Sequence, residues 1–346
     1  MKQVRLILIS LLCVLLLAGC TVQLPSAAAE KHQRQVFAMD TVMILTAYGD
    51  DTAEQALDAA EARILALEAD LDPEREGSSV WTLNQNAGQW VPVSADCFAI
   101  AETAMLVADR SGGALAPQLY SLILRWGFIT GEYRVPEQAE IDAELASVAA
   151  FPMDFDADAS ALRIPEGSKV AFGAVAKGYT AQAALEAMEA AGCETAILSL
   201  GGNVQTLGQT KADGSAWKVA VADPHDPGEY AAMLKCGEKA VVTSGGYQRY
   251  FEQDGKTYIH IIDPATGYPV ENGLLSMTIV CNDGCMADAL STSMFVLGEQ
   301  GAIAYRRAYG GFEMVMITDD GRMVVTEGLR DSFETAPGSY DVEYVE

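Results

Sequence analysis

Residues 286–293, Met286-Ala-Asp-Ala-Leu-Ser-Thr-Ser293, begin an apolar-periodic run that predicts a helix extending to Leu297. Asp288 and Thr292 are four residues apart, so a helix places both on one face. One carboxylate and one hydroxyl then point together, and such hard oxygen ligands suit Mg²⁺ when water and substrate phosphates complete its shell. The alternative on these residues alone is structural, because Asp is favourable near any helix N-terminus.

A second segment, Phe172-Gly-Ala-Val-Ala-Lys-Gly-Tyr179, is a glycine-bearing turn that predicts a helix from Gly173 to Ala191 with Lys177 in its first turns. Amide groups and a cation at a helix N-terminus suit a pyrophosphate. The segment has neither the GxxxxGK[ST] spacing of a phosphate-binding loop nor the dinucleotide fingerprint GxGxxG. Close helix packing through Gly173 and Gly178, with Lys177 in solvent, is the alternative.

Three further motifs follow expected strands. Leu200-Gly-Gly-Asn203 and Ser244-Gly-Gly-Tyr247 contain glycines that let a ligand approach the backbone closely. His260 is one of only three histidines and is expected on a strand that leads into the turn 263–267. A structural role is the alternative for a single strand histidine. No Ser-His-Asp or Cys-His order indicates a hydrolase.

Helical and β-rich runs alternate irregularly around these motifs, which predicts an α+β fold. Apolar periodicity predicts helices over 53–71, 95–110, 137–149, 173–191, 286–297 and 303–309. The β-rich runs predict strands over 36–48, 161–164, 195–200, 204–207, 217–221, 240–243, 247–252, 258–262 and 275–281. A closing hairpin is expected to join 313–317 to 323–326 over Asp320-Gly321.

The N-terminus predicts export. Two basic residues precede an apolar run from Leu6 to Leu17, which is shorter than the roughly 20 residues of a membrane span. Small residues directly before Cys20 are typical of a bacterial lipoprotein signal. We expect residues 1–19 to be removed, Cys20 to be lipidated at the extracytoplasmic face of the cell membrane, and residues 20–34 to form a flexible tether. An ordinary cleaved signal is the alternative.

Composition and length limit the possible partners and the number of domains in the rest of the chain. The formal net charge of −26, from 22 basic and 48 acidic residues, argues against a nucleic-acid partner, since phosphate binding needs clustered Lys and Arg. Residues 35–330 are expected to form one large domain or two closely joined ones, and 331–346 an acidic C-terminal tail. Cys281 and Cys285 lack the further ligands of a metal site and are expected to be free thiols.

Together and in this order, the motifs resemble the FAD:protein FMN transferase family, also called the ApbE family. The resemblance spans Val36 to Thr326. It is carried by Met39-Asp-Thr41, Ser79-Val-Trp-Thr-Leu-Asn84, Ser111-Gly-Gly-Ala114, Gly173-Ala-Val-Ala-Lys-Gly-Tyr179, Leu200-Gly-Gly-Asn203, Ser244-Gly-Gly-Tyr247, His260-Ile-Ile-Asp-Pro-Ala-Thr-Gly267 and Asp288-Ala-Leu-Ser-Thr292.

The resemblance implies an ApbE-like α+β fold, related to the T-fold, with mixed sheets, packed helices and an FAD cleft between two lobes. FAD is then a substrate, and the reaction is Mg²⁺-dependent transfer of FMN to a Ser or Thr hydroxyl of an exported acceptor protein, with release of AMP. The implied Mg²⁺ ligands are the Asp288 carboxylate, the Thr292 hydroxyl and the Ala174 backbone carbonyl. The implied contacts of FAD are Met39, Ala114, Leu115, Lys177 and His260. His260 or Asp288 is expected to take the acceptor's proton.

The chain departs from the family pattern at three positions. Ala171, Ala116 and Gly246 stand where members commonly carry an acidic residue. These losses leave two alternatives: a flavin-binding or flavin-scavenging lipoprotein with little catalysis, and a Mg²⁺-dependent FAD pyrophosphatase that gives FMN and AMP. The transferase is favoured because the chain retains Asp288, Thr292, Lys177 and His260.

Overall fold

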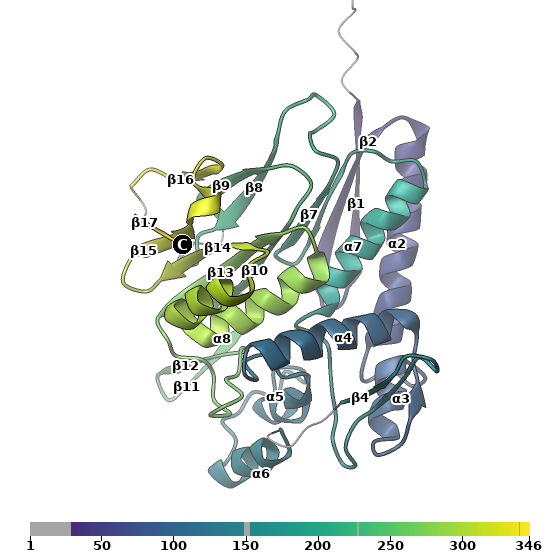
Figure 1. The fold of residues 1–346 in the computed structure, drawn as a ribbon, viewed down its shortest axis with the longest axis vertical. Helices are drawn as coiled ribbons and strands as arrows, with labels where there is room; N and C mark the ends of the chain where they lie inside the picture. The colour runs from purple at the N-terminus through teal and green to yellow at the C-terminus, as the bar shows by residue number, and fades with distance from the viewer. Residues whose placement is uncertain (1–28, 149–152, 227, 339) are drawn as a thin grey trace, which may run out of the picture.

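The computed structural model describes residues 29–148, 153–226, 228–338 and 340–346. Its centre is a nine-stranded mixed sheet in the order β1-β2-β6-β7-β10-β13-β14-β15-β17 (Figure 1). Neighbouring strands are antiparallel except β15 and β17, which are parallel. The strands are β1 (Glu30–Ala38), β2 (Thr41–Gly49), β6 (Ala196–Leu200), β7 (Asn203–Leu207), β10 (Ala240–Gly245), β13 (Leu274–Cys281), β14 (Glu313–Thr318), β15 (Arg322–Thr326) and β17 (Asp341–Val345).

Three long helices cover one face of this sheet, and a fourth packs beneath α8 (Figure 1). They are α2 (Asp51–Leu71), α7 (Ala176–Ala190), α8 (Gly284–Tyr309) and α4 (Ala95–Arg110). Gly298 breaks α8 with a non-helical φ of 71°, which separates the two helices expected at 286–297 and 303–309. Cys281 at the end of β13 and Cys285 at the start of α8 are free thiols, as expected. The α+β prediction is confirmed.

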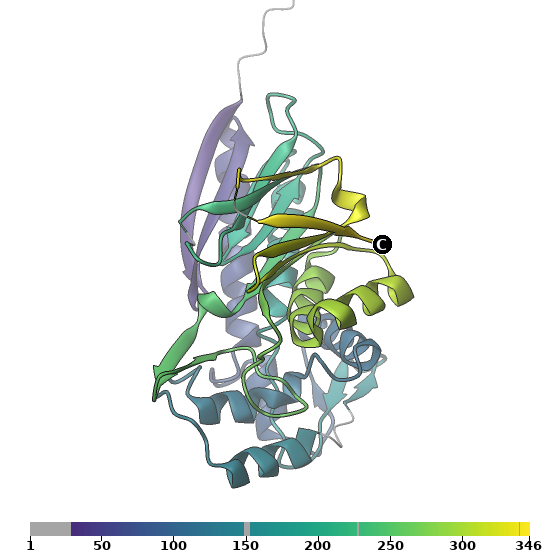
Figure 2. The same cartoon turned by 90° about the vertical axis from the view of Figure 1, so that its left-hand side faces the viewer.

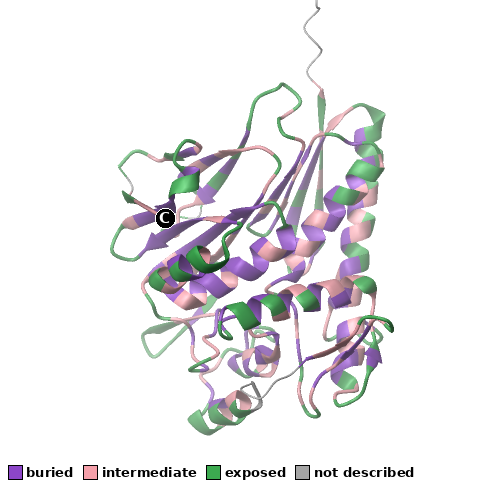
Figure 3. Cartoon of the chain, viewed as in Figure 1, coloured by how far each residue is buried: buried purple, intermediate pink, exposed green. Residues whose placement is uncertain are grey.

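The opposite face of the large sheet is covered by a three-stranded sheet of β16 (Phe333–Thr335), β9 (Tyr230–Cys236) and β8 (Trp217–Ala222). The central strand β13 is therefore enclosed on both faces, as the burial in Figure 3 shows. Met277 and Ile279 pack in the core that contains the helices, whereas Val280 packs in the core under the small sheet. Burial on both faces explains why β13 reads as a nearly continuous apolar run.

A smaller core below α8 builds the remaining wall of the molecule (Figure 2). Trp126 lies at its centre, fully buried, and its Nε1 donates to the Gly267 carbonyl at 3.0 Å. This bond ties the turn after His260 to the helices. The elements around this core are α5 (Tyr120–Trp126), α6 (Gln138–Val148), β11 (Tyr250–Gln253) and β12 (Lys256–Ile259). The remaining short elements pack against the main core that contains the long helices: α3 (Ser79–Gln85), β3 (Val91–Pro92), β4 (Asp154–Asp156) and β5 (Ala161–Arg163). None of the helices within the described ranges combines the length and apolarity that a membrane crossing needs.

The expected tether is too long. Strand β1 begins at Glu30, so residues 30–34 belong to the sheet. They pair with β2, and the Arg34 guanidinium bonds to three carboxylates of α2, those of Glu54, Asp58 and Glu61. Exposed polar residues alternate along β1 because its outer face is open, and this pattern concealed the strand. The expected signal peptide and Cys20 lie outside the described residues.

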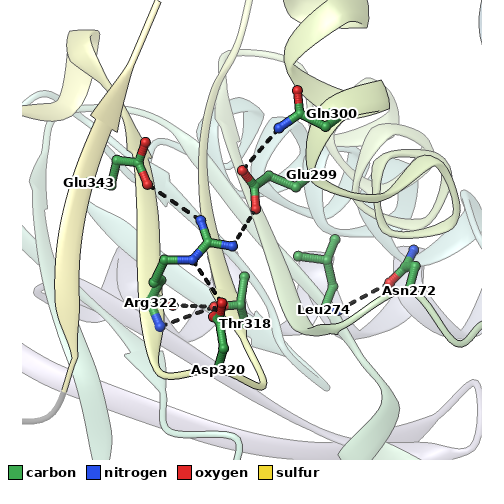
Figure 4. Close-up of polar contacts among 8 residues, drawn as sticks. All are labelled: Asn272, Leu274, Glu299, Gln300, Thr318, Asp320, Arg322 and Glu343. Carbon is green, nitrogen blue, oxygen red and sulfur yellow. Dashed lines mark hydrogen bonds and ion pairs between the residues drawn. The ribbon is translucent and has the colours of Figure 1, made fainter.

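The expected acidic tail at 331–346 is also wrong. Strand β16 pairs with β9, and β17 pairs with β15. Arg322 holds this edge: its guanidinium bonds to Asp320 at 3.0 Å, to Glu343 of β17 at 3.4 Å and to Glu299 of α8 at 2.8 Å (Figure 4). Hydrogen bonds to Glu299 and Asp320 raise the pKa of Arg322. Glu343 thus pairs with Arg322, and Glu334 of β16 pairs with Lys235 of β9, so the segment belongs to two sheets and is not a solvated tail.

Helices α7 and α8 touch at Gly178. A Cβ on Gly178 would lie 2.0 Å from the Gly284 carbonyl oxygen and 2.6 Å from the Asp288 Cβ, so no other residue fits. The Gly178 carbonyl accepts a hydrogen bond from Gln205 Nε2 at 2.8 Å. Close packing is therefore confirmed for Gly178. A Cβ on Gly173, in contrast, would meet no atom of the described residues within 4 Å.

We expect Gly178→Ala to lower the free energy of unfolding by about 1–3 kcal/mol or more, because the helices must separate to admit a methyl group. Urea denaturation followed by tryptophan fluorescence measures this change. Gly173→Ala is the matched control: its φ is not in the left-handed region and the space is open, so its unfolding midpoint should stay close to that of the wild type. Equal midpoints for both variants would contradict the tight contact.

Candidate functional site

A cleft of about 900 Å³ lies where the helix N-termini, the β1–β2 turn and the α5 wall meet. Its volume is within the roughly 300–1,000 Å³ of small-molecule and cofactor sites. Every site residue expected from the sequence lines this cleft. These residues are Met39, Ala114, Leu115, Ala174, Lys177, His260, Asp288 and Thr292.

Asp288 is the buried acid of the cleft, with 4% of its surface exposed. Its Oδ2 accepts a hydrogen bond from the Gly178 N–H at 2.8 Å. Burial raises the pKa of Asp288, while nearby Lys177 and the backbone N–H groups oppose that rise. The carboxylate is thus a desolvated oxygen ligand whose remaining partners are supplied by α7 and by the cleft.

The next expected ligand is the Ala174 carbonyl. Gly178 belongs to the first turn of α7, so its N–H has no acceptor within the helix, and Asp288 supplies one. Ala174 precedes the N-cap Val175 and lines the cleft, so its carbonyl lies outside the hydrogen-bond ladder of the helix. Asp288, Thr292 and Ala174 therefore offer one carboxylate, one hydroxyl and one carbonyl, the hard oxygen donors that Mg²⁺ prefers.

This donor set fits a cation that shares its shell with a substrate. No group of three or more His, Cys, Asp or Glu side chains that could hold a metal occurs in the parts of the chain that the structure describes. A cation at Asp288 must take its remaining ligands from neutral oxygens, water or a bound phosphate, as is usual for Mg²⁺ at phosphate-handling sites.

Two cationic side chains and one orphan amide favour an anionic ligand beside that donor set. Asp288 accepts backbone hydrogen bonds from Lys177 and Gly178 in the first turn of α7, so the positive charge offered to a ligand comes from the Lys177 and Arg249 side chains that line the cleft. Asn203 is 1% exposed, and its Oδ1 accepts from Gln205 Nε2 at 3.1 Å. Its Nδ2 has no partner among the described residues. An unpaired buried donor costs about 1–3 kcal/mol, and an acceptor atom of a ligand would remove that cost.

His260 was expected on a strand, but β12 ends at Ile259 and His260 is the first residue after it. Its Nδ1 lies 3.1 Å from the Arg249 carbonyl oxygen. A carbonyl only accepts, so Nδ1 carries the proton and Nε2 keeps its lone pair in the neutral ring. Burial lowers the pKa of His260 to about 4, with smaller contributions from the Arg249 and Lys177 charges. The imidazole is therefore neutral at neutral pH.

The turn at Met39 and Asp40 is strained, which the sequence did not reveal. Both residues have positive φ, 49° and 59°, in a two-residue loop between β1 and β2. Few residues other than Gly, Asn or Asp adopt this conformation without cost. Glu68 Oε1 accepts the Met39 N–H at 2.7 Å, and Asp40 forms an ion pair with Arg249. These two anchors hold Met39 at the cleft.

The three departures from the family pattern have different surroundings. Ala116 and Ala171 both line the cleft, and the Ala171 N–H donates to the Pro117 carbonyl at 3.1 Å, so these two positions are neighbours. Gly246 is buried, and a Cβ there would lie 2.8 Å from Ile259 Cγ2. An acidic side chain at 246 would need Ile259 to move, because the Ile259 side chain occupies the space that a side chain at 246 would need.

The lowered pKa of His260 predicts a pH dependence of stability. Protonation is harder in the folded protein, near pH 4, than in the unfolded chain, near pH 6.5, so stability falls as pH falls through this window. His260→Gln does not titrate. From pH 7 to pH 4, the wild type should therefore lose roughly 2–3 kcal/mol more unfolding free energy than His260→Gln loses. Parallel pH profiles in urea denaturation would contradict a buried neutral imidazole.

Comparison with known proteins agrees with this geometry. The model of the ApbE family matches residues 39–316. An FAD:protein FMN transferase of Treponema pallidum is 29% identical over 336 residues, covering 92% of this chain and 92% of that protein. An FAD:protein FMN transferase of Vibrio cholerae serotype O1 is 30% identical over 329 residues, covering 91% of this chain and 94% of that protein.

The fold agrees as well. The crystal structure of the ApbE protein from Thermotoga maritima matches with a TM-score of 0.81 at 26% identity, over 88% of this chain and 99% of that chain. The region that the family model matches contains the cleft residues from Met39 to Thr292. In sequence and in fold, this protein belongs to the ApbE family.

Proposed function

We propose that this protein transfers the FMN moiety of FAD to a Ser or Thr hydroxyl of another exported protein, with Mg²⁺ as the cofactor and AMP as the second product. The names of its relatives support an FAD:protein FMN transferase. The observation that carries the proposal is the Asp288–Gly178 contact. It brings a buried carboxylate, the first turn of α7 with Lys177, and the Ala174 residue just before that helix to one end of the cleft.

The cleft's charges suit a dinucleotide diphosphate. Lys177 and Arg249 both line it in a chain that is otherwise strongly acidic. The diphosphate would lie near Lys177, and its oxygens would complete the shell of a cation held by Asp288, Thr292 and Ala174. Bound there, Mg²⁺ would neutralise the charge that grows on the bridging oxygen.

The reaction balances without any further reactant. The acceptor hydroxyl oxygen forms a bond to the FMN-side phosphorus, and the bond from that phosphorus to the bridging oxygen breaks. The bridging electron pair leaves with AMP. The acceptor becomes a phosphoester of FMN, and its hydroxyl proton passes to a base.

His260 is the better placed of the two expected bases. One Asp288 oxygen already accepts the Gly178 N–H, and the carboxylate is assigned to the cation. His260 has a free Nε2 lone pair, although a pKa near 4 makes it a weak base in the free protein. The negative diphosphate would offset the Lys177 and Arg249 charges that help lower this pKa, and so raise it when substrate binds.

One assay separates transfer from its two alternatives, binding without catalysis and FAD hydrolysis. The protein is incubated with FAD, MgCl₂ and a candidate acceptor that carries an exposed Asp-Gly-[Ser/Ala]-[Thr/Ser] segment. We expect flavin fluorescence on the denatured acceptor band and one AMP per flavin attached. AMP without labelled acceptor would mean hydrolysis, and neither product would mean binding alone.

In that assay Asp288→Asn should lower the rate by roughly a hundredfold or more, because it removes the only charged ligand of the proposed cation site. Raising MgCl₂ should restore part of the loss. His260→Ala should slow transfer while leaving FAD binding within a fewfold of the wild type, measured by flavin fluorescence. An undiminished transfer rate for His260→Ala would remove His260 from the role of base.

The proposed acceptors are exported proteins, which agrees with a lipid anchor at Cys20. Mass spectrometry of the mature protein tests this localisation. We expect Cys20 to be the first residue and to carry a diacylglyceryl group, which Cys20→Ser lacks. An unmodified mature N-terminus at another position would contradict the anchor.

A further inference from the structure

Three hydroxyl groups form a hydrogen-bonded chain that ends on the Asp288 backbone carbonyl. Ser244 lies near the end of β10, and Ser291 and Thr292 follow one another on α8. Ser244 Oγ lies 2.8 Å from Ser291 Oγ and 3.3 Å from Thr292 Oγ1. Ser291 Oγ donates to the Asp288 backbone carbonyl at 2.8 Å. Ser244 and Thr292 line the cleft, whereas Ser291 is fully buried.

The direction of every hydrogen bond in this chain is determined. A carbonyl oxygen only accepts, so the single proton of Ser291 points to the Asp288 carbonyl. Ser291 Oγ must then accept from Ser244, which uses the single Ser244 proton. Ser244 Oγ is left as an acceptor, so the Thr292 hydroxyl is the donor in the last bond.

This direction matters for cation binding. A hydroxyl ligand binds a metal through its oxygen lone pairs, and a proton turned toward the cation would oppose binding. With its proton turned to Ser244, the Thr292 oxygen presents its lone pairs elsewhere. Helical Thr residues also tend to donate to the carbonyl four residues earlier, here that of Asp288, but Ser291 already occupies that carbonyl.

We propose that Ser244 and Ser291 are positioning residues that orient the Thr292 hydroxyl and thereby set the affinity of the cleft for a divalent cation. The inference rests on the proposed function, in which Thr292 is a cation ligand. Ser291 gives the stricter test of the two, because it lies outside the cleft and is joined to Thr292 only through two successive hydrogen bonds.

The test measures Mn²⁺ binding to the full-length chain alone, from the electron paramagnetic resonance amplitude of the free ion, with Mg²⁺ as competitor. No turnover contributes to this readout. We expect Ser244→Ala and Ser291→Ala each to weaken Mn²⁺ binding roughly three- to tenfold, the effect of losing one hydrogen bond. Thr292→Val should weaken it at least as much. Ser244→Thr, which keeps the hydroxyl, should bind close to the wild type.

Ser293→Ala is the matched control on the same helix. Ser293 is as buried as Ser291, but its hydroxyl donates to the Ala289 carbonyl at 2.8 Å and takes no part in the chain. Its Mn²⁺ affinity should stay within about twofold of the wild type, since no bond to Thr292 is lost. Circular dichroism and urea midpoints show whether each variant is folded. If Ser291→Ala does not fold, Ser244→Ala still tests the proposal, because Ser244 is only half-buried.

A double-mutant cycle separates positioning from general loosening of α8. Once Thr292→Val has removed the oriented hydroxyl, Ser244→Ala should have no further effect on Mn²⁺ binding. Additive losses would overturn the proposal, as would wild-type affinity in Ser244→Ala and Ser291→Ala while Thr292→Val binds weakly. Wild-type affinity in Thr292→Val would instead remove Thr292 as a ligand, and with it both this inference and the proposed cation site.

Discussion

Gly178 allows the backbones of α7 and α8 to touch, and the cleft depends on this contact. Because no side chain separates the helices at this point, the Gly178 N–H reaches the Asp288 carboxylate at 2.8 Å, and Gln205 reaches the Gly178 carbonyl at the same distance. The same bond gives the Gly178 N–H, which has no acceptor within the first turn of α7, a partner beside the cleft that Ala174 also lines. A packing requirement of the core thus also creates the oxygen-rich end of the cleft.

The electrostatics of the cleft follow from what surrounds each group. Burial raises the pKa of Asp288, and the Lys177 charge and backbone N–H groups act against that rise. Burial lowers the pKa of His260, and the Arg249 and Lys177 charges lower it further, so the imidazole stays neutral. An acid that favours a cation and a base that stays neutral thereby line one cleft.

Much of the fold was predictable where local signals were strong. The helix expected at 95–110 matches α4 residue for residue, because Ser94 caps its start by accepting the Cys97 N–H at 2.9 Å. Strand β9 was missed, since two alanines weaken its β signal, and α3 and α5 are too short to show a period. The wrong assignments at both ends of the domain concern polar edge strands, whose exposed faces lack an apolar alternation.

The candidate site also has a part that local sequence signals predict and a part that they do not. Every candidate site residue chosen from the motifs lines the cleft. The sequence did not predict the contacts that hold these side chains in place. Asp40 and Arg249 are 209 residues apart, and the Ser244 hydroxyl meets Ser291 only when β10 lies against α8. Such partners are brought together by tertiary packing alone.

The strand order also has a kinetic consequence. Strands β1 and β2 form a local hairpin, but the next strand in the sheet is β6, whose Leu200 pairs with Met43. The intervening chain must therefore be ordered before the sheet can grow beyond its first hairpin. Pairings of such large sequence separation raise the contact order, and folding slows accordingly. The unpaired edge of β2 can bind wrong partners until β6 pairs with it. Fast folding of the chain between β2 and β6 therefore reduces the risk of aggregation.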